Sequence, residues 1–233
     1  MLAVGKSERR LKFLSGLALP FLIAVLAWTA LALQLVLFLH YFAAAGRPWP
    51  DALARYSSFF SILTHLFIAV MLTGALLARD AQSIFRRAGV QSAAAVYILV
   101  VMLVYILLLR RAWNPLGPQF IVNMLLHYVV PVLYALYWLI GVPKGGLAWS
   151  DPLRWLAFPL VYFGYSLILG ALRGEYPYRF IDAGALGYPY VLLNGLFLGA
   201  VFLAVGLVVV ALDRAMAKAA VPQPNRPGRR APL

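Results

Sequence analysis

The chain has no cysteine among its 233 residues. Disulfide bonds, thiolate catalysis and cysteine-bound metals are therefore excluded together. Acidic residues are also scarce, with only seven Asp and Glu, and all of them fall in expected loops or at the ends of apolar runs. A proton relay of carboxylates through the middle of the protein is therefore not expected.

Charged residues make up only 12% of the chain, whereas hydrophobic residues make up 64%. A water-soluble domain of this length cannot bury so much apolar surface, so lipid has to cover much of it. Six apolar runs each approach the roughly 20 residues that cross a hydrocarbon core. They are approximately residues 13–40, 53–78, 90–109, 118–140, 153–172 and 188–212. We predict an all-α, polytopic membrane bundle of about six transmembrane helices.

The connections between these runs are short and contain Gly, Pro and charge, which leaves no room for a separate soluble domain. We expect a basic N-terminus over 1–12, a membrane domain over 13–212 and a basic, disordered tail over 213–233. Fourteen of the 20 Lys and Arg fall on the side of the termini, so both termini are predicted to be cytoplasmic. The formal charge of +13 comes with no nucleic-acid-binding motif, and contact with anionic membrane lipids explains it better.

Two of the runs carry polar residues in their interior. Ser57, Ser61 and Thr64 follow i, i+4, i+7 spacing, which is expected to place their hydroxyls on one helix face. Gln119, Asn123, His127 and Tyr134 form a second polar stripe at i, i+4, i+8 and i+15. At 1.5 Å per residue, Thr64 and His127 are expected at similar depths of about 16 and 14 Å. The two stripes favour a shared cavity.

Thr64 and His127 are suited to acyl transfer by residue type. A hydroxyl nucleophile needs a nearby base, and a neutral imidazole can accept its proton. Asn123 could orient the imidazole or donate to an oxyanion, and Asp182 could orient the ring if its loop folds inward. The alternative for Thr64 is a hydrogen bond to its own i−4 carbonyl.

Pro131 has no N–H to bond the carbonyl of His127, four residues earlier in the chain. A kink is therefore expected beside this histidine. Such a kink can open a polar pocket, although prolines in membrane helices also serve only to shape packing.

The segment 173–188 is the densest polar part of the chain and contains the sequence Tyr176-Pro-Tyr178. Its paired charges and glycines favour an ordered cap over the outer mouth of the bundle. The alternative is a simple structured turn between two helices.

Several short stretches follow one another through nearly the whole membrane region: FSILT at 60–64, LHYVVP at 126–131, PKG at 143–145, YPYRFID at 176–182, GY at 187–188 and LN at 193–194. In this succession the chain resembles bacterial members of the androgen-induced-protein family of multi-span membrane proteins. The resemblance implies an intramembrane hydrolase with a threonine nucleophile and a histidine partner, which match Thr64 and His127. Eukaryotic members cleave fatty acid esters of hydroxy fatty acids. The chain departs at Arg179, where bacterial relatives carry proline.

We therefore expect a bacterial inner-membrane hydrolase of lipid esters, without cofactor or metal, whose substrate enters sideways from the bilayer. The further expected cavity residues are Ser61, His65, Asn123, Tyr176, Asp182 and Asn194. Two alternatives belong to other classes. His65 and His127 could be axial ligands of haem in an electron-transfer protein, and the polar stripes also suit a lipid-binding or transport protein.

Overall fold

A computed structural model describes residues 14–80, 82–111 and 114–220, and within these ranges every regular element is a helix. The elements are η1 (Leu14–Ala18), α2 (Leu19–Ala44), α3 (Trp49–Ser57), α4 (Phe60–Leu77), η2 (Ile84–Arg86), α5 (Ala88–Val104), η3 (Tyr105–Leu109), α6 (Pro118–Met124), η4 (Leu125–Val129), α7 (Val130–Gly141), α8 (Asp151–Trp155), α9 (Ala157–Arg173), η5 (Arg179–Ile181), α10 (Ala183–Leu186) and α11 (Tyr188–Ala220). Among the described residues, six helical segments are long and apolar enough to cross a membrane. The predicted all-α, multi-pass architecture is confirmed.

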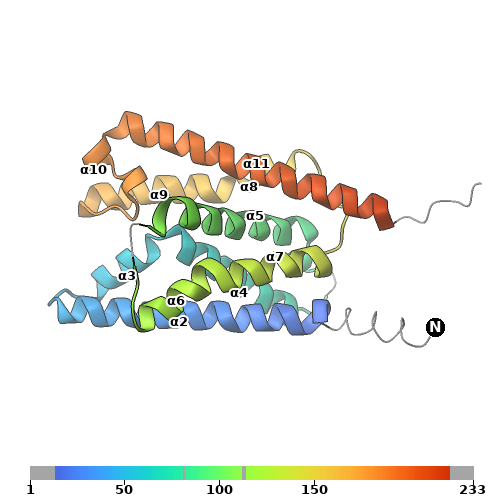
Figure 1. Cartoon of the computed structure of the whole chain (residues 1–233), viewed down its shortest axis with the longest axis horizontal. Coiled ribbons are helices and arrows are strands. Elements are labelled where there is room, and N and C mark those ends of the chain that lie inside the picture. The colour runs from blue at the N-terminus through green and yellow to red at the C-terminus, as the bar shows by residue number, and fades with distance from the viewer. Residues whose placement is uncertain (1–13, 81, 112–113, 221–233) are drawn as a thin grey trace, which may run out of the picture.

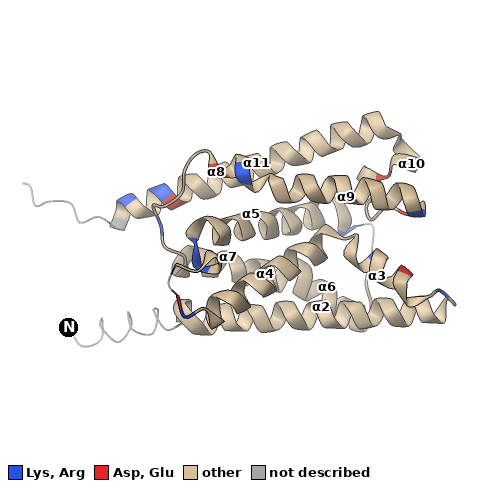
Figure 2. Cartoon of the chain, turned by 180° about the vertical axis from the view of Figure 1, so that it is seen from behind, with Lys and Arg blue, Asp and Glu red and all other residues tan. Residues whose placement is uncertain are grey.

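The long helices lie side by side along the long axis of the bundle (Figure 1). α9 and α11 form one side, α2 lies on the opposite side, and α4, α5 and α7 lie between them. Leu14 and Ala220, where the described chain starts and stops, lie at the same end, as an even number of spans requires. We call this the terminal end and the opposite one, with α3 and α10, the cap end. Charged residues gather towards the two ends (Figure 2).

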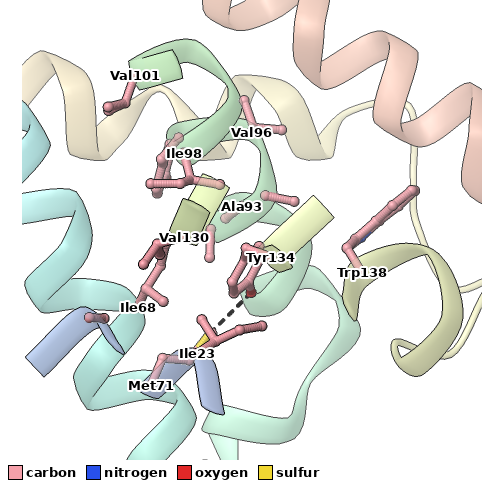
Figure 3. Close-up of a cluster of buried hydrophobic side chains, with 14 of the residues drawn as sticks. Ile23, Ile68, Met71, Ala93, Val96, Ile98, Val101, Val130, Tyr134 and Trp138 are labelled. Carbon is pink, nitrogen blue, oxygen red and sulfur yellow. Dashed lines mark hydrogen bonds between the residues drawn. The ribbon is translucent and has the colours of Figure 1, made fainter. Parts of the chain in front are cut away.

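The core near the terminal end is packed by aliphatic and aromatic side chains from α2, α4, α5 and α7 (Figure 3). Tyr134 is fully buried among them, and its hydroxyl lies 2.9 Å from the carbonyl oxygen of Gln91 and 3.9 Å from Met71 Sδ. Trp138 Nε1 donates to Ser92 Oγ at 2.8 Å. The polar groups that this core buries therefore have partners inside it, as low-dielectric packing requires.

The second apolar run is not one helix. The chain leaves the helical conformation at Phe59, which has φ −87° and ψ 127°, so that α3 ends before α4 begins. Ser57 lies on α3 and bonds Tyr165 at 2.8 Å, whereas Ser61 and Thr64 lie on α4. The predicted stripe of three hydroxyls on one helix face is therefore wrong. Hydropathy continues through the break, so the sequence pattern could not locate it.

The fourth run contains a π-helical turn, η4, between α6 and α7. Pro131 stands in the first turn of α7, immediately after η4. Because proline lacks an N–H, the helix cannot keep regular i→i−4 bonding across this point, and a wider turn accommodates the defect. The predicted disturbance beside His127 takes this form, and His127 lies within the π turn.

α11 continues through Ala220, so the first residues of the predicted tail are helical rather than disordered. Asp213 lies inside this helix, not beyond it, and is 1% exposed. Its Oδ2 accepts a hydrogen bond from the Leu147 amide at 3.2 Å, which fastens the 142–150 loop to α11. The expectation that all carboxylates fall in loops or at span ends is therefore wrong for Asp213. The predicted N-terminal segment 1–12 and the tail from 221 onwards lie outside the described residues.

Candidate functional site

Two adjacent elements carry the polar residues of the interior. α4, with Thr64 and His65, packs against η4, with His127. Thr64 and His65 are fully buried, and Asn123, one turn before His127, is 2% exposed. The structure thus brings the two predicted polar stripes into neighbouring helices, which sequence spacing alone could not establish.

Both histidines are oriented by their own helix. His65 Nδ1 lies 2.7 Å from the carbonyl oxygen of Ser61, and His127 Nδ1 lies 3.2 Å from that of Asn123. A carbonyl can only accept, so in each ring Nδ1 carries the proton and Nε2 presents its lone pair. Each neutral imidazole therefore offers an unprotonated nitrogen, the form that a general base requires.

Tyr105 of η3 fixes the His127 ring further. The two rings stack with centroids 4.0 Å apart and an interplanar angle of 19°. The Tyr105 hydroxyl also accepts a hydrogen bond from Asn123 Nδ2 at 2.7 Å. Tyr105 thus contacts Asn123 and His127 of the predicted stripe, and sequence reasoning missed it. The available signal was an isolated tyrosine in an apolar run. Because the sequence does not show its neighbours in the fold, such a tyrosine looks the same as one at the membrane interface. The other two members of the stripe do not join this site, since Gln119 bonds Gln34 at 2.9 Å and Tyr134 bonds the Gln91 carbonyl in the core near the terminal end.

Three buried polar atoms in this cluster lack a hydrogen-bond partner among the described residues: Thr64 Oγ1, His65 Nε2 and Asn123 Oδ1. An unpaired buried polar group costs about 1–3 kcal/mol. Such groups persist where they serve a function or bind a molecule. We call Thr64, His65, Asn123 and His127 the unpaired cluster.

A cavity of about 670 Å³ adjoins this cluster, between α4 and α5 on one side and α9 and α11 on the other. This volume lies within the range of about 300 to 1,000 Å³ that is usual for ligand sites. Its wall is overwhelmingly apolar, with His127, Ser61, Tyr162 and Tyr178 as the hydroxyl- or imidazole-bearing residues in it. Thr64 is not in the wall but lies three residues along α4 from Ser61.

The cavity reaches the lipid-facing surface of the bundle. Leu160, Leu192 and Leu196 belong to its wall and are 61%, 52% and 74% exposed. These positions lie on α9 and α11, within spans whose exposed faces meet lipid. One side of the cavity is therefore bounded by side chains on the outer face of the bundle, whereas His127 lies in its inner wall.

The segment 174–187, here called the cap, covers the other end of the cavity with Tyr178, Phe180 and Ile181. Tyr178 Oη accepts a hydrogen bond from the Phe60 amide at 3.1 Å, and Asn194 Nδ2 donates to the Phe180 carbonyl at 2.8 Å. Asn194 therefore holds the cap and does not line the cavity. The expected ordered cap is present in this geometry, in preference to a simple turn.

Two other predicted cavity residues serve the cap itself. Tyr176 packs its ring on Gly170, where a Cβ would clash with the ring, and its carbonyl accepts from Arg55 at 3.0 Å. Asp182 Oδ1 accepts from the Ala185 amide at 3.0 Å and so caps α10. Neither residue is in the cavity wall, and the structure does not bring Asp182 into a bond with His127.

A network of ion pairs fastens the cap end from outside. Asp51 of α3 pairs with Arg173 at 2.8 Å and with Arg47 at 3.3 Å, and Arg47 also reaches Glu175 at 3.0 Å. The hydrogen bonds from Arg173 and Arg47 hold the pKa of Asp51 below its usual value, against the opposing effect of desolvation. We call these four residues the outer network; it joins the first connection of the chain to the start of the cap.

Metal and haem binding can be weighed against the same geometry. Over the described ranges, there is no group of three or more His, Cys, Asp or Glu that could hold a metal ion. Haem ligation through both histidines would need both Nε2 atoms on one iron, whereas only His127 is in the cavity wall and His65 is fully buried outside it. Thr64 is likewise fully buried outside the wall, so His127 is the member of the pair Thr64 and His127 that faces the cavity.

Comparisons of the chain with protein-family models, with curated proteins and with solved structures found no match.

Proposed function

We propose that this multi-pass membrane protein is an intramembrane hydrolase of lipid esters, with Thr64 as nucleophile and His127 as base. One observation carries the proposal. His127 presents an unprotonated nitrogen in the wall of an apolar cavity that opens to lipid, beside a helix with an unpaired threonine hydroxyl. A bacterial inner membrane is the location that the family resemblance favours.

The reaction begins when the ester carbonyl enters between Ser61 and His127 of the wall, which belong to α4, the helix of Thr64, and to η4, which packs against it. Thr64 Oγ1 attacks the carbonyl carbon, and His127 Nε2 takes the hydroxyl proton. When the tetrahedral intermediate collapses, the ester C–O bond breaks and His127 returns the proton to the departing alcohol oxygen.

The second half of the reaction releases the acid. Water attacks the acyl-Thr64 ester while His127 accepts its proton, and the returning threonine oxygen is reprotonated. Tyr105 supports both halves, because its stacking on the imidazole restricts the rotation of the ring. The fatty chain lies in the cavity, against the apolar side chains of α5, α9 and α11.

The test is labelling of the purified protein with a fluorophosphonate, combined with turnover of a long-chain acyl ester in nanodiscs. Wild type is expected to carry the adduct on Thr64, and Thr64→Ala and His127→Ala to lose about 10³-fold or more of turnover, as removal of a nucleophile or base does. Thr73→Ala is the matched control, since it removes a hydroxyl from the same helix outside the cavity wall, where Thr73 accepts a hydrogen bond from Trp28.

An adduct on Ser61, or normal turnover by Thr64→Ala, would reject Thr64 as nucleophile. Absence of turnover in wild type for a panel of acyl esters would reject the hydrolase. A Soret band that disappears in His127→Ala would instead support the haem alternative, and uptake of lipid into vesicles without hydrolysis would support a transporter.

A further inference from the structure

Tyr178 occupies an unusual place, because it belongs to the cap but its hydroxyl lies at the start of α4. Phe60 is the first residue of α4, and the preceding residue, Phe59, supplies no side-chain cap. The first amides of a helix have no partner within the helix. The Phe60 amide donates to Tyr178 Oη instead, so the tyrosine caps the helix and is held in one position.

The ring of Tyr178 is fixed from both sides. It stacks on Phe180 with centroids 5.1 Å apart and an interplanar angle of 6°, and it meets Phe59 edge-on at 5.8 Å. The hydrogen bond from Asn194 to the Phe180 carbonyl ties this stack to α11. A hydroxyl held in this way loses little freedom when it binds a ligand, which is what preorganised donors require.

The Tyr178 hydroxyl can donate a hydrogen bond as well as accept one. Oη accepts from the Phe60 amide and carries a hydrogen of its own to donate; Ser61 and Tyr162 are the polar neighbours of this hydroxyl within the protein, and a carbonyl oxygen in the cavity would compete with them for that hydrogen. Burial raises the pKa of Tyr178, so the hydroxyl keeps its proton at neutral pH. Tyr162, the other tyrosine of the wall, already donates to the Ser58 carbonyl at 2.7 Å.

The cavity therefore has a donor at its capped end and a base deeper in its wall. His127 offers a lone pair at Nε2, whereas Tyr178 offers an O–H. The carbonyl oxygen of a lipid that enters this apolar space needs a donor to replace the one it loses on leaving the interface.

We propose that Tyr178 donates a hydrogen bond to the carbonyl oxygen of the bound ester. The inference rests on the proposed hydrolase function and adds the residue that binds the oxyanion of the tetrahedral intermediate. The developing negative charge at this oxygen strengthens the bond, and the nearby N-terminus of α4 favours the same charge. Asn194 acts through Phe180 and is a positioning residue.

Turnover gives the first test. Tyr178→Phe removes only the hydroxyl, and kcat is expected to fall about 10²–10³-fold with KM little changed, as for other oxyanion donors. Tyr165→Phe is the matched control, because Tyr165 lies on α9 outside the cavity wall and its hydroxyl bonds Ser57. Unchanged kcat in Tyr178→Phe, in a protein whose Thr64→Ala variant is inactive, would overturn the inference and leave the hydrolase intact.

A second measurement does not depend on turnover. A long-chain ketone labelled with ¹³C at its carbonyl has no leaving group, and its infrared stretch moves to lower frequency when the oxygen accepts a hydrogen bond. In the Thr64→Ala protein, we expect a shifted band that returns to its hydrocarbon position on adding Tyr178→Phe but not Tyr165→Phe. An unshifted band before any change at Tyr178, a ketone that does not bind, or a shift that is lost with Ser61→Ala and kept with Tyr178→Phe would each overturn the inference.

Discussion

The unpaired cluster and the core near the terminal end bury the same kinds of side chain but treat them differently. Between α5 and α7, Trp138 Nε1 donates to Ser92 Oγ and Tyr137 Oη donates to Gln91 Oε1 at 3.1 Å. Between α4 and η4, the Thr64 hydroxyl and the His65 Nε2 have no partner among the described residues. Both regions lie within spans of one bundle.

The difference separates polar residues that hold helices together from those that are available to a substrate. A satisfied pair in a low-dielectric interior specifies which helices meet and in which register. An unsatisfied group contributes nothing to that and costs free energy. Ser166 Oγ and Asp213 Oδ1 are also unsatisfied among the described residues, so it is the grouping of three such atoms beside His127, and not one atom alone, that favours a role in binding or chemistry. The cavity adjoins the unpaired cluster, because His127 is in its wall.

The largest expected effect comes from Thr64→Val, which replaces the unpaired hydroxyl with a methyl group. Turnover is expected to fall by about 10³-fold or more, whereas the midpoint of thermal unfolding stays the same or rises, because a buried group without a partner is removed. Both are measured on the purified protein in detergent. A variant that lost stability together with activity would show that Thr64 has a structural role, and that the unpaired cluster and the core near the terminal end do not differ in this respect.

Ser92→Ala is expected to show the opposite pattern. Trp138 Nε1 would lose its acceptor, and unfolding free energy is expected to fall by about 1–3 kcal/mol. Hydrolysis should continue at nearly the wild-type rate at temperatures where the variant is folded. Denaturant titration gives the stability, with Thr73→Ala, on the surface hydrogen bond from Trp28, as a control for loss of a hydroxyl without loss of a buried pair.

The smallest effect is expected in the outer network. The pKa of Asp51 is lowered in the folded protein, so its contribution to holding the cap is complete above the usual value of 3.8 and is lost as pH falls through the lowered value. Because the chain has no cysteine, spin labels on Leu53→Cys and Ala185→Cys report the distance from α3 to α10 without background.

The distribution of that distance is expected to stay narrow from neutral pH down to the usual carboxyl pKa. It should broaden as pH falls through the lowered pKa of Asp51, or at high salt, which screens exposed charges. Asp51→Asn should give the broadened distribution at every pH. A distance that ignored both pH and Asp51→Asn would show that the hydrogen bonds of Tyr178 and Asn194 hold the cap by themselves.

Sequence reasoning found the spans accurately where apolar runs ended at a breaker or a charge, as at Pro118 and Arg173. It failed at Phe59, where the helix breaks inside an apolar run, and at Asp213, where a helix continues past the last apolar residue. Hydropathy records what a residue prefers as solvent but not how the backbone turns or what a charge meets.

The candidate site was likewise predicted only in part. Residue types and spacing directed attention to Thr64, His65, Asn123 and His127, because polar residues in apolar runs are few, whereas the choice of Thr64 and His127 as a catalytic pair rested on the family resemblance. The sequence did not point to Tyr105 or Tyr178, because each is placed by a neighbour distant in the chain: Tyr105 on η3 stacks on His127, and Tyr178 bonds the first turn of α4.

The amino-acid sequence by itself determined that this protein is a helical bundle embedded in lipid, because the free energy of transferring each apolar run from water into the membrane depends only on its own composition. Tertiary structure decided which helices are neighbours, which polar atoms are left unpaired and where the cavity opens. These properties depend on packing between segments far apart in the chain, and no local pattern contains them.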